Sequence, residues 1–306
     1  MSQNSELLQY IVAKMKEICC IGHITRDRII TQQSHHVTHC AGGTAYYVAW
    51  ALQALKVPDS AFQLITSVSA EVMPEVEKLR QGGVDVMAFE SPTNVFFENA
   101  YGVNMDHRTQ RVLAKSEPFT IAQLEQAEAK VFHLGTLLAD DFAPEVVEFL
   151  ATKGDVSIDV QGFLRAVEGE QVLSTEWSDK RRLLKHTAIL KVNEWECQSL
   201  TGLTNPFTAA ELIHDWGVRE VIVTLGGGGS IIYAEGKFYE TPAYPPRQLV
   251  DATGCGDTYS AGYLYCRSQG MDYQESGRFA AAMCTLKLEH TGPFRHTIEE
   301  VRALIR

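Results

Sequence analysis

The chain has 306 residues, of which 45% are hydrophobic, so it can bury the core of one large α/β domain or two smaller ones. Its 38 acidic and 27 basic residues give a net charge of −11, which disfavours nucleic acid and anionic membrane surfaces as partners. Residues 1–6 are polar, no run approaches the roughly 18 apolar residues of a membrane span, and the seven cysteines form no C-x-x-C pair, so we expect a cytoplasmic protein.

Short apolar runs recur along the chain and alternate with segments of helical period. The runs are apolar throughout, which is typical of strands buried on both faces of a sheet. Such strands joined by helices predict an α/β fold with a doubly wound, mostly parallel sheet flanked by helices. The expected strands are 18–21, 63–68, 84–89, 131–134, 156–160, 188–192 and 221–225, and the expected helices are 45–55, 74–81, 121–129, 144–152 and 209–216.

Two regions depart from this rhythm. Residues 28–43 and 93–116 mix apolar and polar positions, as hairpins with one solvated face do. We expect them to form a small β-sheet lid that projects from the main body. No linker or repeat divides the rest, so we interpret residues 1–306 as one domain with the lid inserted in it.

The C-terminal third predicts a different ending for the sheet. Residues 230–234 and 237–241 follow the last expected parallel strand with only tight turns between them, so they should be antiparallel. Two long helices are expected at 258–268 and 273–290, each followed by a glycine.

A glycine-rich turn precedes the first of these helices. In Asp251-Ala-Thr-Gly-Cys-Gly-Asp257, Gly254 and Gly256 stand just before a helix that we expect to begin near Asp257. Glycines let backbone N–H groups turn toward one point, where the positive end of the helix dipole also lies. The segment therefore predicts an anion site. Asp257 is either a base that accepts a proton from a substrate hydroxyl or only the N-cap of the helix, and spacing alone favours neither.

This segment resembles the second signature of the ribokinase-like (PfkB) carbohydrate kinases, which reads Asp-Thr-x-Gly-Ala-Gly-Asp. The chain departs from it at Ala252 and Cys255, which are both small. The resemblance implies that Asp257 is the catalytic base and that Gly254, Cys255 and Gly256 form the anion hole. It also implies a ribokinase-like fold.

Further motifs follow in the order of that family. Asn193 and Glu196 match its Asn-x-x-Glu motif, which implies that they organise Mg²⁺ and its waters near the phosphates of ATP. Thr224 and Gly226 match its Thr-x-Gly segment, which approaches the nucleotide. Taken singly, the first motif also fits a strand end followed by a solvated helix, and residues 226–229 fit a hairpin turn.

Near the N-terminus, Gly22-His-Ile-Thr-Arg-Asp27 resembles the opening Gly-x-x-x-x-Asp of the family, which implies that Asp27 binds substrate hydroxyls. Gly42 and Gly43 resemble the first signature, in which a glycine pair lies against the sugar. The alternatives are a surface charge for Asp27 and a loop hinge for the glycines. The resemblance extends to Gly292 and implies that the lid closes over the substrate and excludes water.

The acceptor is less constrained. Where typical sugar kinases of the family carry an Asn, this chain has Tyr46 and Tyr47, and the segment from Asp159 to Arg165 is similar to a branch that includes inositol kinases. Two interpretations stay open: Arg165 and Gln161 contact a polyol or an acidic group of the substrate, or Arg165 only pairs with a carboxylate of the fold. We expect a monosaccharide or polyol substrate. A nucleoside kinase is the alternative within the family, and a catalytically silent, nucleotide-binding regulatory protein is the alternative outside it.

The resemblance also implies activation by K⁺, with backbone oxygens near Asp251 and Thr253 as ligands, although Ala252 departs from the pattern. Some relatives dimerise through the lid, and the sequence does not decide whether this chain forms a homodimer. The expected cofactors and partners are therefore ATP, Mg²⁺, K⁺ and a small sugar or polyol.

Overall fold

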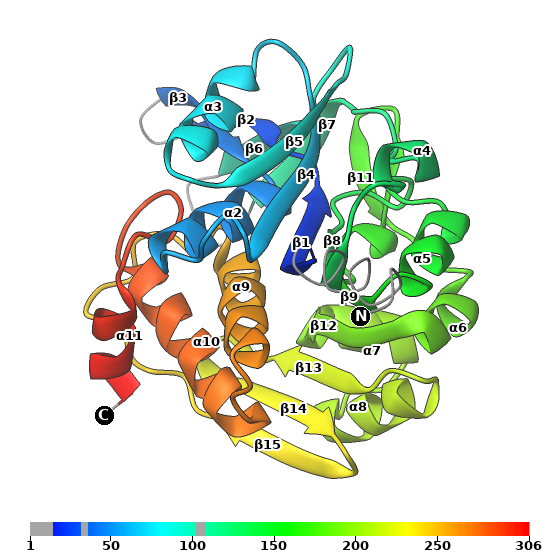
Figure 1. The fold of residues 1–306 in the computed structure, drawn as a ribbon, viewed down its shortest axis with the longest axis vertical. Coiled ribbons are helices and arrows are strands. Elements are labelled where there is room, and N and C mark those ends of the chain that lie inside the picture. The colour runs from blue at the N-terminus through cyan, green and yellow to red at the C-terminus, as the bar shows by residue number, and fades with distance from the viewer. Residues whose placement is uncertain (1–14, 32–35, 102–107, 306) are drawn as a thin grey trace, which may run out of the picture.

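A computed structural model describes residues 15–31, 36–101 and 108–305 of the chain. The described strands form a sheet of nine strands and a sheet of six (Figure 1). The larger sheet has the order β15-β14-β13-β12-β9-β8-β1-β4-β5. Its strands are β1 (Lys16–Gly22), β4 (Phe62–Val68), β5 (Asp85–Glu90), β8 (Ala129–Gly135), β9 (Asp155–Asp159), β12 (Thr187–Asn193), β13 (Glu220–Thr224), β14 (Ser230–Ala234) and β15 (Lys237–Thr241).

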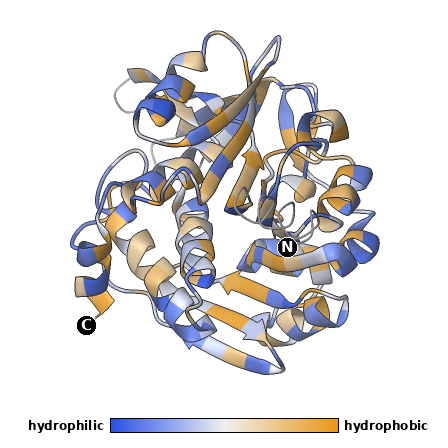
Figure 2. Ribbon diagram, viewed as in Figure 1, coloured by the Kyte–Doolittle hydropathy of each residue, from blue (hydrophilic) through white to orange (hydrophobic). Residues whose placement is uncertain are grey.

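The strands of the larger sheet are apolar throughout because their two faces enter two different cores. In β1, Ile18 and Cys20 belong to one core, whereas Cys19 and Ile21 belong to the other. Figure 2 shows the central strands in hydrophobic colours, and the helices around them carry mixed ones. The first core is covered by α2 (Thr44–Ala54), α3 (Met73–Gln81), α9 (Cys255–Ser268), α10 (Tyr273–Leu288) and α11 (Ile298–Ile305), and the second by α4 (Ile121–Leu124), α5 (Pro144–Ala151), α6 (Lys180–Leu183), α7 (Glu194–Thr201) and α8 (Pro206–Asp215).

Seven of these strands run parallel, and β14 and β15 are antiparallel at one edge. The predicted doubly wound, mostly parallel sheet with an antiparallel end is thus confirmed. Residues 226–229 connect β13 to β14 through the short 3₁₀ turn η3 (Gly226–Gly228), as the hairpin interpretation required. The other 3₁₀ turns are η1 (Gly162–Leu164) and η2 (Leu184–His186).

The chain reverses its direction of travel across the larger sheet at β1. It first adds β4 and β5 on one side of β1, and then returns to add β8, β9 and β12 on the other. Gly22 and Gly135 pair where β1 and β8 end. Open α/β sheets bind ligands in the crevice beyond the carboxyl ends of the strands at such a reversal. The topology therefore places a binding crevice above Gly22 and Gly135.

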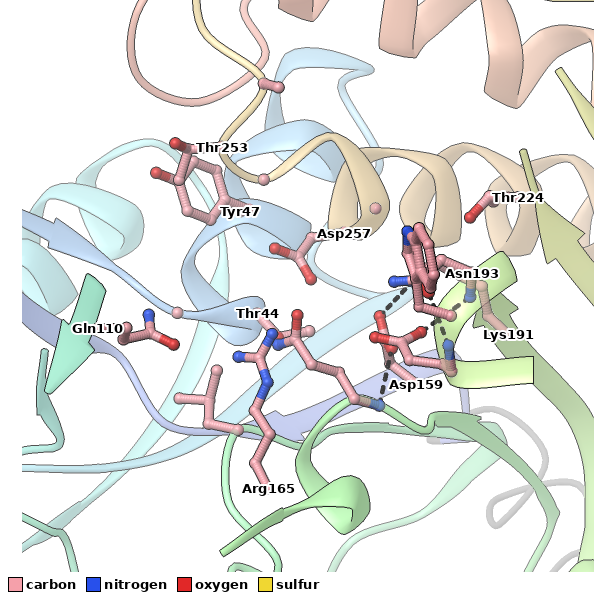
Figure 3. A pocket seen from close by; sticks show the side chains of 18 of the residues that line it. Thr44, Tyr47, Gln110, Asp159, Arg165, Lys191, Asn193, Thr224, Thr253 and Asp257 are labelled. Atoms are coloured by element: carbon pink, nitrogen blue, oxygen red, sulfur yellow. Dashed lines mark hydrogen bonds and ion pairs between the residues drawn. The ribbon is translucent and has the colours of Figure 1, made fainter. Parts of the chain in front are cut away.

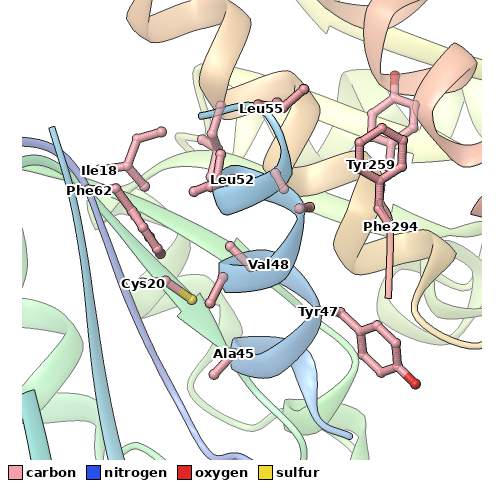
Figure 4. Close-up of a cluster of buried hydrophobic side chains, with 14 of the residues drawn as sticks. Ile18, Cys20, Ala45, Tyr47, Val48, Leu52, Leu55, Phe62, Tyr259 and Phe294 are labelled. Atoms are coloured by element: carbon pink, nitrogen blue, oxygen red, sulfur yellow. The ribbon is translucent and has the colours of Figure 1, made fainter. Parts of the chain in front are cut away.

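Helix α2 packs one face on the sheet and turns another toward this crevice. Ala45, Val48 and Leu52 point at β1 and β4, which carry Cys20 and Phe62, whereas Tyr47 projects from a different side of the helix (Figure 4). Tyr47 lies against Gly254 at the N-terminus of α9, which borders the same crevice.

The second sheet has the order β10-β11-β7-β6-β2-β3. Four of its strands come from the two segments that we expected to form a lid. The hairpin of β10 and β11, which begins at Arg165, was not predicted from the sequence. Val95, Phe97 and Val112 of this sheet region pack on Leu137 and Leu138, just beyond the end of β8. The strands are β2 (Thr25–Thr31), β3 (His36–Gly42), β6 (Phe96–Tyr101), β7 (Arg108–Ala114), β10 (Arg165–Glu168) and β11 (Gln171–Ser174).

Two helix boundaries differ from the sequence-based expectation. The helix expected over 121–129 is a single turn, α4, because Ala129 already belongs to β8. The helix expected to begin near Asp257 begins at Cys255, because Gly254 takes the cap position. Within the described parts of the chain, none of the helices combines the length and the apolar character needed to cross a membrane.

Candidate active site

A pocket of about 460 Å³ opens beyond the carboxyl ends of the parallel strands, between the second sheet and the N-termini of α2 and α9 (Figure 3). Most of the residues predicted from the sequence line it, although they come from distant parts of the chain. Three of them, Gly42, Cys255 and Asp251, are not among its lining residues. The predicted residues in the lining are Asp27, Gly43, Arg165, Asn193, Glu196, Thr224, Gly226, Thr253, Gly254, Gly256 and Asp257.

Asp257 is the third residue of α9 and not its cap. The cap is Gly254, whose φ of +76° lies in the left-handed region that glycine adopts most easily. A Cβ on Gly254 would also lie 2.3 Å from the ring of Tyr47, so a side chain has no room there. The alternative that Asp257 serves only as an N-cap is therefore wrong. Its carboxylate and the guanidinium of Arg165 point toward the same space (Figure 3).

The first turn of α9 presents backbone donors to the pocket. The amide of Cys255 donates to the carbonyl of Ala252 at 3.2 Å, so this predicted member of the anion hole is already engaged. The amides of Gly256 and Asp257 donate to no backbone oxygen in the described part of the chain. Lys191 adds positive charge, since a Cβ on Gly256 would lie 3.0 Å from its Nζ. Two amides, a helix N-terminus and an ammonium group thus converge on one place.

Lys191 forms a buried ion pair that the sequence did not predict. Its Nζ lies 2.6 Å from Oδ2 of Asp159, and the two side chains are only 8% and 3% exposed. Burial lowers the pKa of Lys191, but the carboxylates of Asp159, Glu196 and Asp257 together outweigh it and raise that pKa, so the lysine stays charged. The two residues are register partners on β12 and β9. Their places at the ends of parallel strands were the available signal in the sequence.

The pKa of Asp257 is raised to about 6. Desolvation is the largest cause, and the nearby Asp159 carboxylate adds to it, while Lys191 and Arg165 act in the opposite direction. A carboxylate with this pKa is deprotonated near neutral pH, yet it is a stronger base than an ordinary aspartate. Asp257 therefore has the properties of a general base.

Asn193 and Glu196 form a reciprocal capping box at the start of α7. The Asn193 side chain accepts from the Glu196 amide at 2.9 Å, and Glu196 Oε2 accepts from the Asn193 amide at 2.8 Å. Glu196 is nevertheless partly buried in the pocket wall and not on a solvated face. Burial, followed by the Asp159 carboxylate, raises its pKa. The carboxyl groups of Glu196 and Asp159 thus favour a cation near them, and Lys191 already supplies one.

The opposite end of the pocket is built around Asp27. Its Oδ1 accepts a hydrogen bond of 2.7 Å from the hydroxyl of Thr25. A Cβ on Gly42 would lie 2.6 Å from Asp27 Oδ2, so a larger residue at this position would displace the carboxylate. Gly43 follows as the cap of α2 and lines the pocket itself. The glycine pair thus has a packing role around Asp27.

Two neighbouring pairs of aromatic residues, Tyr46 with Tyr47 and Phe96 with Phe97, each contribute one ring to the pocket lining. Tyr47 and Phe97 line the pocket, and both are buried. Tyr46 instead stacks edge-on with Trp50, with ring centroids 6.1 Å apart. The Phe96 ring lies 5.0 Å from the guanidinium carbon of Arg26, outside the pocket.

Two amide side chains of the small sheet complete the lining, and the sequence did not predict them. Nε2 of Gln110 on β7 donates to Oδ1 of Asn99 on β6 at 3.0 Å. Asn99 follows Phe97 by two positions, so both lie on the face of β6 that covers the pocket. That period of two was the signal that pointed to Asn99.

A second cavity, of about 570 Å³, adjoins the first and shares Thr224, Gly226, Ala252 and Gly256 with it. We call it the apolar cavity, because most of its further lining consists of aliphatic, aromatic and proline residues from the loop after β15, α9 and α10. Leu249 at its edge is 73% exposed. Its further lining includes Ala243, Tyr244, Pro245, Pro246, Leu249, Tyr259, Ala281 and Leu288.

Comparison with known families bears on this arrangement. Residues 15–297 match the pfkB family of carbohydrate kinases. The chain belongs to that family. It is therefore a phosphotransferase that acts on hydroxyl groups, and its relatives include kinases of sugars and of nucleosides.

Individual relatives point to different acceptors. This kinase is 26% identical to a cytidine kinase of Thermococcus kodakarensis over 93% of its own length and 100% of the relative. It is 28% identical to a pyrophosphate-dependent kinase of the ribokinase family complexed with a pyrophosphate analogue and myo-inositol, with a TM-score of 0.83 over 94% and 99% of the two chains. Arabidopsis thaliana ribokinase, in complex with ribose and ATP, is 20% identical with a TM-score of 0.75 over 95% and 99%. The ribokinase-like fold is thus confirmed.

Proposed function

We propose that the protein transfers the γ-phosphoryl group of ATP to a hydroxyl of a monosaccharide or polyol. One observation carries the proposal. Asp257, with a pKa near 6, stands at the N-terminus of α9, between an anion-binding group of donors and a pocket end lined by polar side chains. A base between an acceptor site and a phosphoryl site is the arrangement that in-line transfer needs.

The polar end of the pocket supports a polyol or sugar acceptor. Asp27 offers a carboxylate, and Asn99, Gln110 and Gln161 of the same lining offer amides. Several fixed acceptors and donors of this kind match a molecule with a hydroxyl on successive carbons. Arg165 adds a cation between this end and Asp257.

In the proposed reaction, the acceptor hydroxyl donates its proton to Asp257 as its oxygen attacks the γ-phosphorus. The bond from that phosphorus to the bridging oxygen breaks, and ADP leaves with the bonding electron pair. Lys191 and the amides of Gly256 and Asp257 stabilise the charge on the transferred group. Because these donors are already in place, no further reorganisation is needed to stabilise that charge.

The donor set also fits Mg²⁺. Asp159 and Glu196 are near enough for the first to raise the pKa of the second, and Mg²⁺ binds through one or two carboxylates, waters and phosphates. When bound with ATP, the ion neutralises charge on the β- and γ-phosphates. The residues of this chain that would hold its water shell are Asp159, Asn193 and Glu196.

The apolar cavity supports ATP as the donor over pyrophosphate. Pyrophosphate has no apolar part, whereas a purine base buries two aromatic faces. The cavity adjoins the anion site at Gly256 and extends to Leu249, an apolar side chain that is largely exposed. This favours a nucleotide, even though some similar structures are of pyrophosphate-dependent kinases.

We also propose that the second sheet acts as a lid. Asp27, Phe97, Asn99 and Gln110 reach the pocket from its strands, so closure of this sheet would exclude water from the transfer.

A nucleoside acceptor is a second candidate, and a specific observation favours it. Tyr47 and Phe97 both line the pocket and offer aromatic surface to a base. The similarity to a cytidine kinase along nearly the whole chain agrees with this reading.

An acceptor and donor screen tests both candidates. ADP or phosphate release would be followed with ATP or pyrophosphate against monosaccharides, inositols, sugar acids and nucleosides. We expect turnover with ATP and a sugar or polyol. Turnover confined to nucleosides would replace the acceptor, and turnover confined to pyrophosphate would replace the donor. Mutation of Asp257 to Asn in the same assay separates enzyme turnover from contamination.

A further inference from the structure

Lys287, near the end of α10, is fully buried and lies behind the glycine-rich turn. Its Nζ donates to the backbone oxygen of Asp251 at 2.9 Å and lies 3.1 Å from Oδ2 of the same residue. The backbone oxygen of His290 is a third acceptor at 3.5 Å. The Lys287 side chain is 0% exposed, so water cannot solvate its charge.

This environment matches the needs of an ammonium group. A buried charge is tolerated only when it is paired and its hydrogen-bonding capacity is used, and a lysine has three N–H donors. Lys287 has three oxygen acceptors, and one of them belongs to a carboxylate. Nothing further is required of a ligand at this position.

The same oxygens bear on the K⁺ expected from the sequence. That expectation placed K⁺ on oxygens near Asp251 and Thr253. Both Asp251 oxygens that face α10 already hold the Lys287 ammonium, which is a monovalent cation attached to the chain. A second monovalent cation beside it would meet charge repulsion in a buried place. The residues present therefore do not fit K⁺ at Asp251.

Lys287 is coupled to the anion site through Asp251. Oδ1 of Asp251 accepts from the Thr253 amide at 2.9 Å, one residue before Gly254. The amides of Val250 and Asp251 donate to the carbonyl of Leu288, so this stretch is tied to the end of α10 as well. Burial raises the pKa of Asp251, but hydrogen bonds from Thr253 and the charge of Lys287 outweigh it and hold that pKa below its usual value. Asp251 stays ionised and holds the turn in place.

We propose that the ammonium of Lys287 replaces a monovalent metal cation behind the anion-site turn, so that phosphoryl transfer by this chain needs no K⁺. Lys287 is a positioning residue, because it acts through Asp251 and the turn. The consequence for activity rests on the proposed kinase function, whereas the consequence for the structure does not.

The test compares the unaltered chain with two variants in buffers of K⁺ or tetramethylammonium at equal ionic strength. The unaltered chain should show equal Tm and equal turnover in both. Lys287→Ala removes the ammonium and opens a space beside the Asp251 oxygens, so its Tm should fall by roughly 5–10 °C in tetramethylammonium and recover in part in K⁺. The KM of this variant for ATP should rise in tetramethylammonium and fall back in part in K⁺.

Lys287→Met fills that space without a charge, so its Tm should fall and should not respond to K⁺. Leu286→Ala on the same helix is the matched control, because it loses packing without losing charge and should be insensitive to the cation. A K⁺-dependent rise in Tm or turnover of the unaltered chain would overturn the proposal. So would a Lys287→Ala variant that is indifferent to K⁺.

The thermal measurement keeps this proposal separate from the kinase proposal. Tm is recorded without substrate, so it reports on Lys287 even if every acceptor fails to turn over. If neither variant folds, the comparison of the unaltered chain in the two buffers still decides between a built-in and an external cation.

Discussion

Two buried lysines, each paired with an aspartate, flank the N-terminus of α9, and they differ in how many hydrogen-bond acceptors the protein gives their ammonium groups. Lys191 pairs with Asp159 at 2.6 Å and faces the pocket, where the described residues give its ammonium one hydrogen-bond acceptor. Lys287 pairs with Asp251 and has three acceptors away from the pocket. We call the first the open pair and the second the closed pair. Capacity left unused by the protein is available to a ligand, so the same two residue types can serve binding in one place and positioning in the other.

The largest expected effect lies beside the open pair. Asp257→Asn should lower kcat by about 10³-fold, because the amide cannot accept the hydroxyl proton. Binding of ATP, measured by calorimetry, should change little. Retention of normal kcat in this variant would remove Asp257 from the mechanism.

Neutralising each lysine should break the two pairs in different ways. Lys191→Met should lower kcat/KM for ATP by about 10²-fold, since it removes the positive charge that stabilises the transferred phosphoryl group. Lys287→Met should lower Tm and raise KM, with a smaller effect on kcat. Steady-state kinetics and thermal unfolding of both variants measure the contrast, and equal profiles would mean that the open and closed pairs do not differ in role.

The acceptor end should respond on binding more than on turnover. Asp27→Asn should raise KM for the acceptor by about tenfold, the usual scale for a hydrogen bond to a charged group. Glu71→Gln is the matched control, because Glu71 pairs with the neighbouring Arg26 at the surface. An unchanged KM in Asp27→Asn would place the acceptor elsewhere.

The pH dependence of kcat/KM tests the same base in the unaltered enzyme. Asp257 acts as a base only when deprotonated, and its pKa is raised to about 6. The kcat/KM should therefore hold above that pH and fall about tenfold for each unit below it. Because Lys191 lowers this pKa, Lys191→Met should move the fall to higher pH, whereas Lys287→Met should leave it in place. A profile that is flat from pH 5 to 8 is incompatible with this base.

The smallest effect concerns the donor. Ala281 lines the apolar cavity and is 7% exposed. Ala281→Leu should raise KM for ATP several-fold by filling that space, with little change in kcat. Activity with a donor that lacks a nucleobase, such as inorganic triphosphate, should be unaffected. An equal loss with both donors would mean that the cavity does not hold the nucleobase of ATP.

Much of the fold and of the candidate site was predictable because the signals are local. The uniformly apolar runs gave the parallel strands, since a strand covered on both faces needs apolar residues at every position. The turn from Asp251 to Asp257 and the capping box of Asn193 and Glu196 are each contiguous, so their geometry follows from neighbouring residues. The hairpin that begins at Arg165 was missed, because its strands are short and none of their residues is fully buried.

By itself, the sequence determined the α/β sheet, the anion-binding turn and the family whose motifs it carries. Only the tertiary structure showed that Lys191 meets Asp159 and that Lys287 meets Asp251. These partners are 32 and 36 residues apart in the chain. A charged residue carries no local mark of its partner, because parallel strands and packed helices bring together segments that the sequence keeps apart. The charge at the phosphoryl site, and the cation behind it, were therefore settled by packing.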